Sequence, residues 1–272
     1  MDRVLAFLKE RIHDDLLPWS AQDSAAGQFG LSHAAVEALA LQNGIGPARY
    51  QRNRNMISLA EQLHLYESRI AVIGCGGLGG YVVEELARLG IGQIVAIDPD
   101  VFEEHNLNRQ LLSSISALGK AKVEAALTRV REINPAVTLT PVRDAYCASN
   151  GRELLSGATV VVDALDSIAT RLELAETCTE LQIPLVFGAI GGWYGQVATQ
   201  LPGDRTIQNI YRNWVNGQGI EKELGNPSFT PALIASLQVA EVCKIVLGRG
   251  ELLRHRKLSV DLHDMEFHEI TD

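Results

Sequence analysis

The chain has 272 residues, 46% of them hydrophobic, and this length suits one large α/β domain with an appendage. The net charge of −9 argues against a general affinity for nucleic acid, whose phosphates favour clustered Lys and Arg. The first residues do not resemble a targeting segment, and no run of about 18 apolar residues predicts a membrane span. Four scattered cysteines without CxxC pairing suit a reducing compartment, so we expect a soluble cytoplasmic protein.

The first 48 residues are expected to form a helical appendage. Apolar residues lie along one helical face of residues 1–17, and Pro18 ends this pattern. A second helix is predicted to begin after an N-cap at Ser32 and to stop at residues 44–47, which read Gly-Ile-Gly-Pro. The sequence assigns no role to this appendage, and residues 49–272 are taken as the main domain.

From residue 63 onward, strands and helices alternate. Strands are predicted at 70–73, 93–97, 137–142, 158–163 and 184–187. Helices are predicted at 78–89, 118–132, 150–155 and 167–181. The continuously apolar strands are typical of parallel strands that helices cover on both faces. With right-handed crossovers, this order predicts an α/β fold with a doubly wound, mostly parallel sheet.

The pattern changes after Gly188. An irregular stretch is expected up to Pro231, and a long loop inside a compact domain is usually functional. A helix over residues 232–247 and two strand-like runs at 257–262 and 265–270 complete the chain as an antiparallel extension.

A glycine loop is the strongest functional signal. The strand at 70–73 runs into residues 74–79, Gly-Cys-Gly-Gly-Leu-Gly, and Asp98 closes the next strand. Glycines let phosphates approach the main-chain amides at a helix start, and a carboxylate in the position of Asp98 accepts hydrogen bonds from a ribose. The loop therefore predicts a nucleotide site, although it suits a nicotinamide dehydrogenase equally well.

Charged side chains follow the other strands at the same predicted edge of the sheet. Arg109 lies beyond the second strand, Lys122 begins a helix, and Asp166 follows the apolar run 160–162. A triphosphate needs several cations, and a carboxylate can hold Mg²⁺ against phosphate oxygens. Taken singly, Arg109 suits a surface charge, Lys122 a solvated lysine, and Asp166 or Asp163 the N-cap of a helix at Ser167. Their joint occurrence around one crevice favours the nucleotide site.

In combination, these motifs resemble the ThiF/MoeB/HesA adenylyltransferases that activate ubiquitin-like sulfur carriers. The motifs are RYxR at 49–52, GxGGLG at 74–79, DxD at 98–100, NLxRQ at 106–110, GxxK at 119–122 and DxxDxxxxR at 163–171. The resemblance covers residues 49–270. It implies that the C-terminal glycine of a small protein ending in Gly-Gly attacks the α-phosphate of ATP, giving an acyl-adenylate and pyrophosphate.

The resemblance also implies roles for single residues. Arg109 and Lys122 would contact the phosphates, and Asp166 would hold Mg²⁺. Arg52 would reach the ATP of the partner subunit in a homodimer as a finger, with Arg54 as its competitor. The implied ATP-binding residues are Gly74, Gly76, Gly77, Leu78, Gly79, Asp98, Asp100, Asn106, Asn108, Arg109, Lys122, Leu165 and Asp166. Arg171 is expected to support the site through an ion pair.

The chain departs from the family pattern in its cysteines. It lacks the paired CxxC motifs of many members, so no structural zinc is expected. Residues 188–242 contain no cysteine, which points to an enzyme that stops at the adenylate. Cys75, Cys147 and Cys178 are expected to be structural.

The glycine-rich segment around Trp193 leaves two alternatives open. Its small residues suit a channel for an extended diglycine tail, or a strand pair with Trp193 packed in the core. Whether the loop 198–230 covers that tail is open at this stage.

Other functions also stay open on the sequence. They are a relative of the same fold that adenylates a small molecule or a modified tRNA, a non-catalytic nucleotide-binding partner, and an NAD oxidoreductase. The last lacks an evident proton-relay His or Tyr after the cofactor domain. The identity of the sulfur carrier is not encoded in any motif.

Overall fold

The computed structural model describes residues 1–213 and 224–271. Its main feature is an eight-stranded sheet in the order β10-β9-β8-β7-β6-β3-β4-β5. The five parallel strands are β3 (Arg69–Ile73), β4 (Gln93–Ile97), β5 (Thr138–Val142), β6 (Val160–Asp163) and β7 (Leu185–Gly191). The antiparallel extension consists of β8 (Tyr194–Gln200), β9 (Arg256–Asp261) and β10 (Glu266–Thr271). This confirms the predicted doubly wound sheet.

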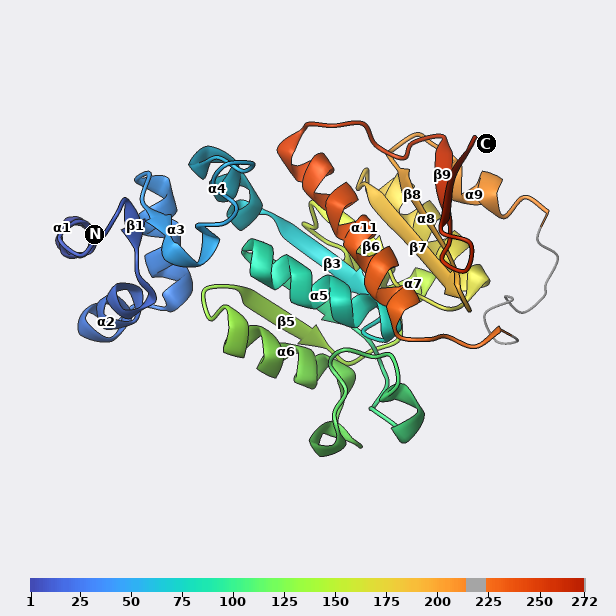
Figure 1. Ribbon diagram of the computed structural model, residues 1–272, viewed down its shortest axis with the longest axis horizontal. Coiled ribbons are helices and arrows are strands. Elements are labelled where there is room, and N and C mark those ends of the chain that lie inside the picture. Colours follow the sequence, from blue (N-terminus) through green and yellow to red (C-terminus); the bar gives the residue numbers. More distant parts are fainter. Residues whose placement is uncertain (214–223, 272) are drawn as a thin grey trace.

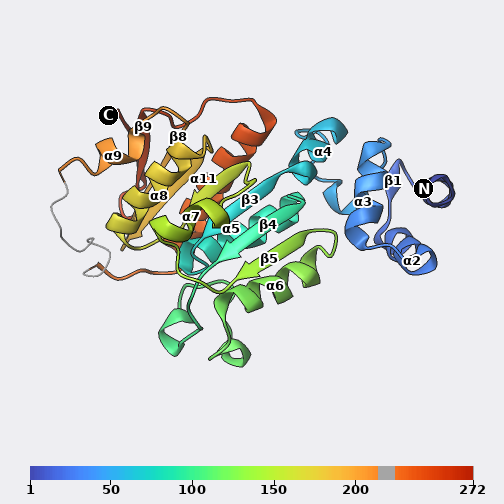
Figure 2. The same ribbon diagram turned by 180° about the vertical axis from the view of Figure 1, so that it is seen from behind.

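Helices cover both faces of the sheet. One face carries α5 (Gly77–Leu89), α6 (Lys122–Ile133) and α11 (Phe229–Leu247) (Figure 1). The other carries α7 (Ala148–Leu154), α8 (Ile168–Glu180) and α9 (Thr206–Ile210) (Figure 2). Because side chains alternate along a strand, Ile70 and Val72 of β3 enter the first core and Ala71 and Ile73 enter the second. This explains why the strand is continuously apolar.

The long helix α11 is the only described helix with the length and hydropathy to cross a membrane. It packs against α5 and lies on the sheet, with Ile234, Val239 and Val242 buried in the first core (Figure 1). A core helix passes the same test of composition, so its apolar sequence is accounted for by packing.

The N-terminal residues form a module with a core of its own. It contains α1 (Asp2–Lys9), α2 (Trp19–Phe29), α3 (His33–Gln42) and a short parallel pair of β1 (Leu16–Leu17) with β2 (Gly46–Pro47). The prediction of one helical pattern up to Pro18 is wrong, because Asp14 and Asp15 have positive φ and turn the chain back. Ser32 caps α3 as predicted, accepting a hydrogen bond from the Ala35 amide at 3.1 Å.

Four other elements differ from the sequence expectations. The helix α4 (Leu59–Glu67) was not predicted, although Ser58 and Glu61 form a capping box at its start. Nor is the stretch after Gly188 irregular, because β7 runs on to Gly191 and turns into β8; α9 also lies within that stretch.

The helix expected from residue 118 begins at Lys122, since residues 115–117 form the 3₁₀ turn η3 and Gly119 has a φ of +78°. Two further 3₁₀ turns, η1 (Ala48–Tyr50) and η2 (Glu104–Asn106), lie in connections.

Candidate functional site

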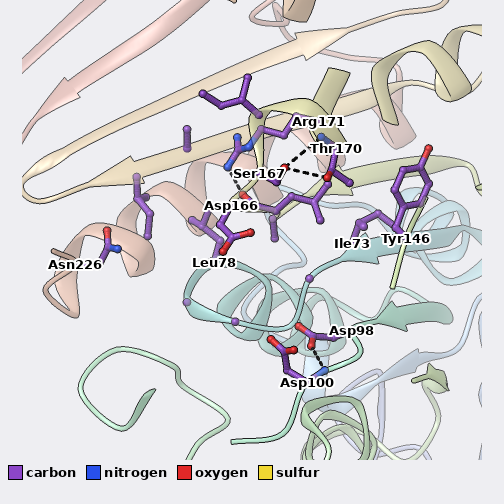
Figure 3. A pocket seen from close by; sticks show the side chains of 18 of the residues that line it. Ile73, Leu78, Asp98, Asp100, Tyr146, Asp166, Ser167, Thr170, Arg171 and Asn226 are labelled. Carbon is purple, nitrogen blue, oxygen red and sulfur yellow. Dashed lines mark hydrogen bonds between the residues drawn. The ribbon is translucent and has the colours of Figure 1, made fainter. Parts of the chain in front are cut away.

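A cavity of 770 Å³ opens at the carboxyl ends of the parallel strands. The chain leaves β3 toward β4 and β5 on one side and returns to β6 and β7 on the other, so the crevice lies at the topological switch point. Most of the residues predicted for ATP binding line it, namely Gly74, Gly76, Gly77, Leu78, Asp98, Asp100, Arg109, Lys122, Leu165 and Asp166. Figure 3 shows Asp166 beside Leu78, with Asp98 and Asp100 together farther from them.

The glycine loop is held tightly between β3 and α5. A Cβ added at Gly79 would lie 1.8 Å from the carbonyl oxygen of Gly74, so Gly79 serves close packing and is not among the lining residues. The Cys75 amide donates to Oδ2 of Asp98 at 2.7 Å. Burial, and secondarily the Asp98 carboxylate, raises the pKa of the Cys75 thiol, which fits the predicted packing role.

Lys122 lies between two carboxylates at the start of α6. Its buried Nζ is 2.8 Å from Oδ2 of Asp100 and 3.9 Å from Oδ1 of Asp98. An amine is a poor choice at a helix N-terminus unless an anion shares the site, and here the chain itself supplies the anions. Asp98 also accepts the Asp100 amide at 2.8 Å, so one carboxylate fixes both the glycine loop and the lysine.

Arg109 reaches the cavity from the segment after η2. Its Nη1 donates to the carbonyl of His105 at 3.1 Å and to Oδ1 of Asn108 at 3.0 Å. Asn108 in turn donates to the carbonyl of Asn226 at 3.0 Å, and Asn106 accepts the Glu103 amide at 2.9 Å inside η2. Neither Asn106 nor Asn108 is among the residues that line the cavity. Their hydrogen bonds instead shape the segment that presents Arg109.

The turn after β6 presents Asp166. Neither Asp166 nor Asp163 caps α8, because Ser167 does, accepting the Thr170 amide at 3.4 Å. Asp163 is fully buried, 3.6 Å from Nη1 of Arg171, and burial raises its pKa although Arg171 opposes the shift. Asp166 is left exposed at the cavity (Figure 3).

Arg171 joins this turn to the neighbouring strand. It donates to the carbonyl of Gly188 at 2.7 Å and to the carbonyl of Leu165, and its guanidinium lies over the ring of Phe187. The structure shows the expected ion pair, with Asp163 as the partner of Arg171, and Arg171 also lines the cavity.

The donors at the cavity fit a magnesium ion bound mainly through substrate. Among the described residues, no group of three or more His, Cys, Asp or Glu side chains lies close enough to hold a metal. Mg²⁺ in nucleotide sites commonly uses one or two carboxylates together with phosphate oxygens and water. The exposed carboxylate of Asp166 is a suitable single ligand of this kind.

Arg52 and Arg54 lie away from the cavity of their own chain. Both are exposed in the turns between η1 and α4. Because α4 leads into the start of β3, this segment is at the amino end of the strands (Figure 1). The cavity is at their carboxyl end.

The glycine-rich segment forms the β7–β8 hairpin, which confirms the strand pair and leaves the channel for a diglycine tail untested. The strand pair is correct, but Trp193 is not in the core: it is 45% exposed and contacts the rings of Phe229 and His263. Gly191 and Gly195 of the hairpin line the cavity. Of the loop 198–230, residues 214–223 lie outside the described residues.

Several lining residues were not singled out from the sequence. Tyr146 follows β5, donates to Oγ1 of Thr177 at 2.8 Å, and has its pKa raised to about 12 by burial. Its place after a strand was the available signal. Gln196 lies on β8 and accepts from Nζ of Lys257 at 3.2 Å; the strand pair that places it was one of two alternatives, and neither of them marked this side chain.

The cysteines differ in exposure. Cys178 is buried in α8, and burial raises its pKa to about 12. Cys147 is the exposed N-cap residue of α7, with its Sγ 3.0 Å from Oγ of Ser149. Hydrogen bonds from Ser149 and from the Asn150 backbone lower the pKa of this thiol. The structural role expected for Cys147 is thus a helix cap at the surface and not core packing.

Comparisons with known proteins bear on this site. A model of the ThiF family matches residues 50–272. The SAMP-activating enzyme E1 of Haloferax volcanii is 34% identical over 226 residues, which are 82% of this chain and 84% of that protein. The adenylyltransferase and sulfurtransferase MOCS3 of Drosophila virilis is 31% identical over 271 residues, 96% of this chain but 59% of that protein. The molybdopterin-synthase adenylyltransferase of Salmonella typhimurium is 30% identical over 208 residues, 76% of this chain and 84% of that protein.

Solved structures share the fold. E. coli MccB superposes with a TM-score of 0.71 at 20% identity, covering 88% of this chain and 76% of that one. E. coli tRNA N6-threonylcarbamoyladenosine dehydratase, TcdA, in complex with ATP gives a TM-score of 0.63 at 24% identity, covering 74% of this chain and 94% of that one. At these identities the likeness concerns the fold alone.

Proposed function

The chain belongs to the ThiF family and is an adenylyltransferase, and from this premise we propose that it adenylates the C-terminal glycine of a small ubiquitin-like sulfur-carrier protein. The carboxylate of that glycine attacks the α-phosphate of ATP, and pyrophosphate leaves. The names of the relatives support this choice of substrate, since they include a SAMP-activating E1 and molybdopterin-synthase adenylyltransferases.

The observation that carries the proposal is the grouping of Lys122, Arg109 and the glycine loop around one cavity. Attack at the α-phosphate moves negative charge onto phosphate oxygens and onto the departing pyrophosphate. Preorganised cations and backbone amides stabilise such charge without reorganising at the moment of reaction. The helix α5 begins at the loop, and Gly77 and Leu78 of its first turn line the cavity, so a helix start of the kind that binds phosphates is at the site.

The charged lining residues described above have the following roles in this proposal. Lys122 and Arg109 bind phosphate oxygens, and Lys122 does so by exchanging its contact with the exposed carboxylate of Asp100 for one with ATP. Asp98 fixes the loop and faces the ribose. Asp166 would hold Mg²⁺, which when bound supplies charge neutralisation for the leaving pyrophosphate. Arg171 keeps the turn bearing Asp166 against β7.

The proposed reaction uses no cysteine nucleophile. Residues 188–242 contain no cysteine, and Cys147 is not among the residues that line the cavity. The acyl-adenylate is therefore the expected product, to be consumed by a separate sulfur-transfer reaction.

The proposed assembly is a homodimer in which Arg52 reaches the neighbouring cavity as a finger. Its support is that Arg52 lies at the amino end of the sheet, away from the cavity of its own chain. We place the enzyme in the cytoplasm, where ATP is supplied and its four free thiols stay reduced.

Pyrophosphate exchange into ATP tests the proposed function. Exchange should appear only when a small ubiquitin-like protein ending in Gly-Gly is added, because the carboxylate of its tail is the nucleophile. The control is the same protein without its last glycine. Exchange driven by free amino acids, short peptides or tRNA would overturn the choice of substrate, and tight binding of NAD would overturn the reaction class.

A further inference from the structure

We infer that a buried polar network between the N-terminal module and the main domain positions the turn that carries Arg52. This network, called the anchor network below, consists of Glu37, Arg49, Tyr50 and Asn134. The inference rests on the proposed finger role of Arg52 and gives a role to the module that precedes it.

Glu37 of α3 is the centre of the anchor network. It is fully buried, its Oε1 accepts the Tyr50 hydroxyl at 2.6 Å, and its Oε2 is 3.0 Å from Nη1 of Arg49. Burial raises the pKa of Glu37, although Arg49 opposes the shift. A buried carboxylate needs its partners in fixed geometry, so the module fixes the backbone at residues 49 and 50.

Asn134 ties the same two residues to the main domain. At the end of α6, its Nδ2 donates to the Tyr50 hydroxyl at 2.9 Å and to the carbonyl of Ala87 in α5 at 3.0 Å, and its Oδ1 accepts from Arg49. The helices α5 and α6 begin at the glycine loop and at Lys122. Tyr50 is therefore fixed to the far ends of the two helices that form the cavity.

Gly90 makes this attachment possible. A Cβ at this position would lie 2.4 Å from the Tyr50 hydroxyl, and its φ of +85° is a conformation that favours glycine. The backbone at the end of α5 and the Tyr50 side chain are thus fitted to each other.

The far end of the turn is also held. Arg249 donates to the carbonyl of Met56 at 2.5 Å and is 3.1 Å from Glu61 of α4. Arg52 lies between Tyr50 and Met56, on a segment fixed at both ends, with its side chain exposed. Ordering a long charged side chain costs entropy when it engages a second subunit, and a pre-ordered backbone lowers that cost.

A double-mutant cycle separates positioning from plain stability. Tyr50→Phe removes one hydroxyl, and Glu37→Gln removes the buried charge; each should lower kcat for exchange roughly ten- to hundredfold with KM for ATP unchanged. Neither should lower kcat further in an Arg52→Ala background. Glu84→Gln is the matched control. It removes a buried carboxylate of α5 that forms ion pairs with Arg88 and Arg129. It should lower Tm and leave kcat near the wild-type value.

The outcomes distinguish the two proposals. An equal loss of kcat in the Arg52 and Arg52→Ala backgrounds, or a loss of Tm alone, would overturn the anchor network and leave the proposed function standing. If Tyr50→Phe or Glu37→Gln does not fold, the other variant carries the same comparison. Absence of Gly-Gly-dependent exchange in the wild type would overturn the proposed function and this inference together.

Discussion

Lys122 illustrates how the site depends on single residues. A lysine at the first position of a helix opposes the helix dipole, and Asp98 and Asp100 compensate for it. The same carboxylates hold the glycine loop and the start of α6 together. In the proposed function the Lys122 ammonium is therefore already positioned, and ATP binding needs only that it exchange Asp100 for a phosphate oxygen. Such preorganisation is the main source of electrostatic catalysis.

Replacing Lys122 by Met should separate this lysine from an ordinary one. Lys122→Met should lower kcat for exchange roughly 10²- to 10³-fold, because a preorganised cation at the developing charge is lost. The matched control is Lys120→Met, two residues earlier, where the side chain is exposed and outside the cavity lining. The rates are compared at saturating ATP. Equal effects of the two substitutions would contradict the role given to Lys122.

Alkylation should single out Cys147 among the four cysteines. Its thiol is exposed with a lowered pKa, whereas burial raises the pKa of Cys178 to about 12 and that of Cys243 to about 11. Iodoacetamide reacts with the thiolate, so the rate at which Cys147 is labelled should rise with pH. The midpoint of this rise should lie at a lower pH than that of a small-molecule thiol. Mass spectrometry of the modified peptides locates the label. Cys147→Ser should remove the fast phase and leave exchange intact; loss of exchange in this folded variant would show a catalytic thiol.

At the level of elements, the sequence predicted the central strands and helices with nearly the observed bounds. Continuous apolar runs and helical periodicity are local signals, and they identified β3, β4, β6 and α8. The family assignment was likewise readable from motifs, and so was the glycine loop that lines the cavity. The N-terminal turn at Asp14 was not, since positive φ at an aspartate leaves no periodicity to detect.

The irregular stretch expected after Gly188 was wrong for a tertiary reason, although a strand pair around Trp193 had been one alternative. Its glycines suggested a loop, but a Cβ at Gly195 would lie 2.3 Å from Ile234, and one at Gly188 would lie 2.4 Å from Gln238. Both contacts are with α11, so these glycines let a helix approach a strand.

The motif around Arg109 shows a second limit of sequence reading. Asn106 and Asn108 belong to this motif, but their side chains hydrogen-bond to the neighbouring backbone. Motif membership does not distinguish a ligand from its support.

Two neighbouring glycines of α5 provide a test of the loop's packing. Gly79→Ala would place a Cβ 1.8 Å from the carbonyl of Gly74, so the loop must shift, and overpacking of this kind costs about 1–3 kcal/mol. We expect a lower Tm and weaker ATP binding. Gly80→Ala is the control, because its Cβ would lie 3.4 Å from the Leu112 side chain, an ordinary contact, and alanine favours a helix. Equal ATP affinity and Tm in the two variants would contradict the close-packing role of Gly79.

The whole molecule divides its functions between the two ends of the sheet. The carboxyl end carries the cavity with Lys122, Arg109 and Asp166. The N-terminal module lies beyond the amino end (Figure 1), where the segment between η1 and α4 carries Arg52. A net charge of −9 is compatible with binding a triphosphate because the cations are gathered at one cavity. If Arg52 acts in catalysis, this division requires a second copy of the chain, since one subunit cannot bring both ends together.

Mixing two impaired variants tests that requirement. Arg52→Ala keeps a complete cavity, and Lys122→Met keeps the finger, so a mixed dimer contains one site with both intact. Random reassociation of equal amounts should restore about a quarter of the wild-type exchange rate, because half of the dimers are mixed and each has one working site of two. Each variant alone, taken through the same dissociation and reassociation, is the control. If the dimers are shown to exchange subunits and the exchange rate does not recover, Arg52 does not act in the partner's site. Arg52 would then have a structural role alone.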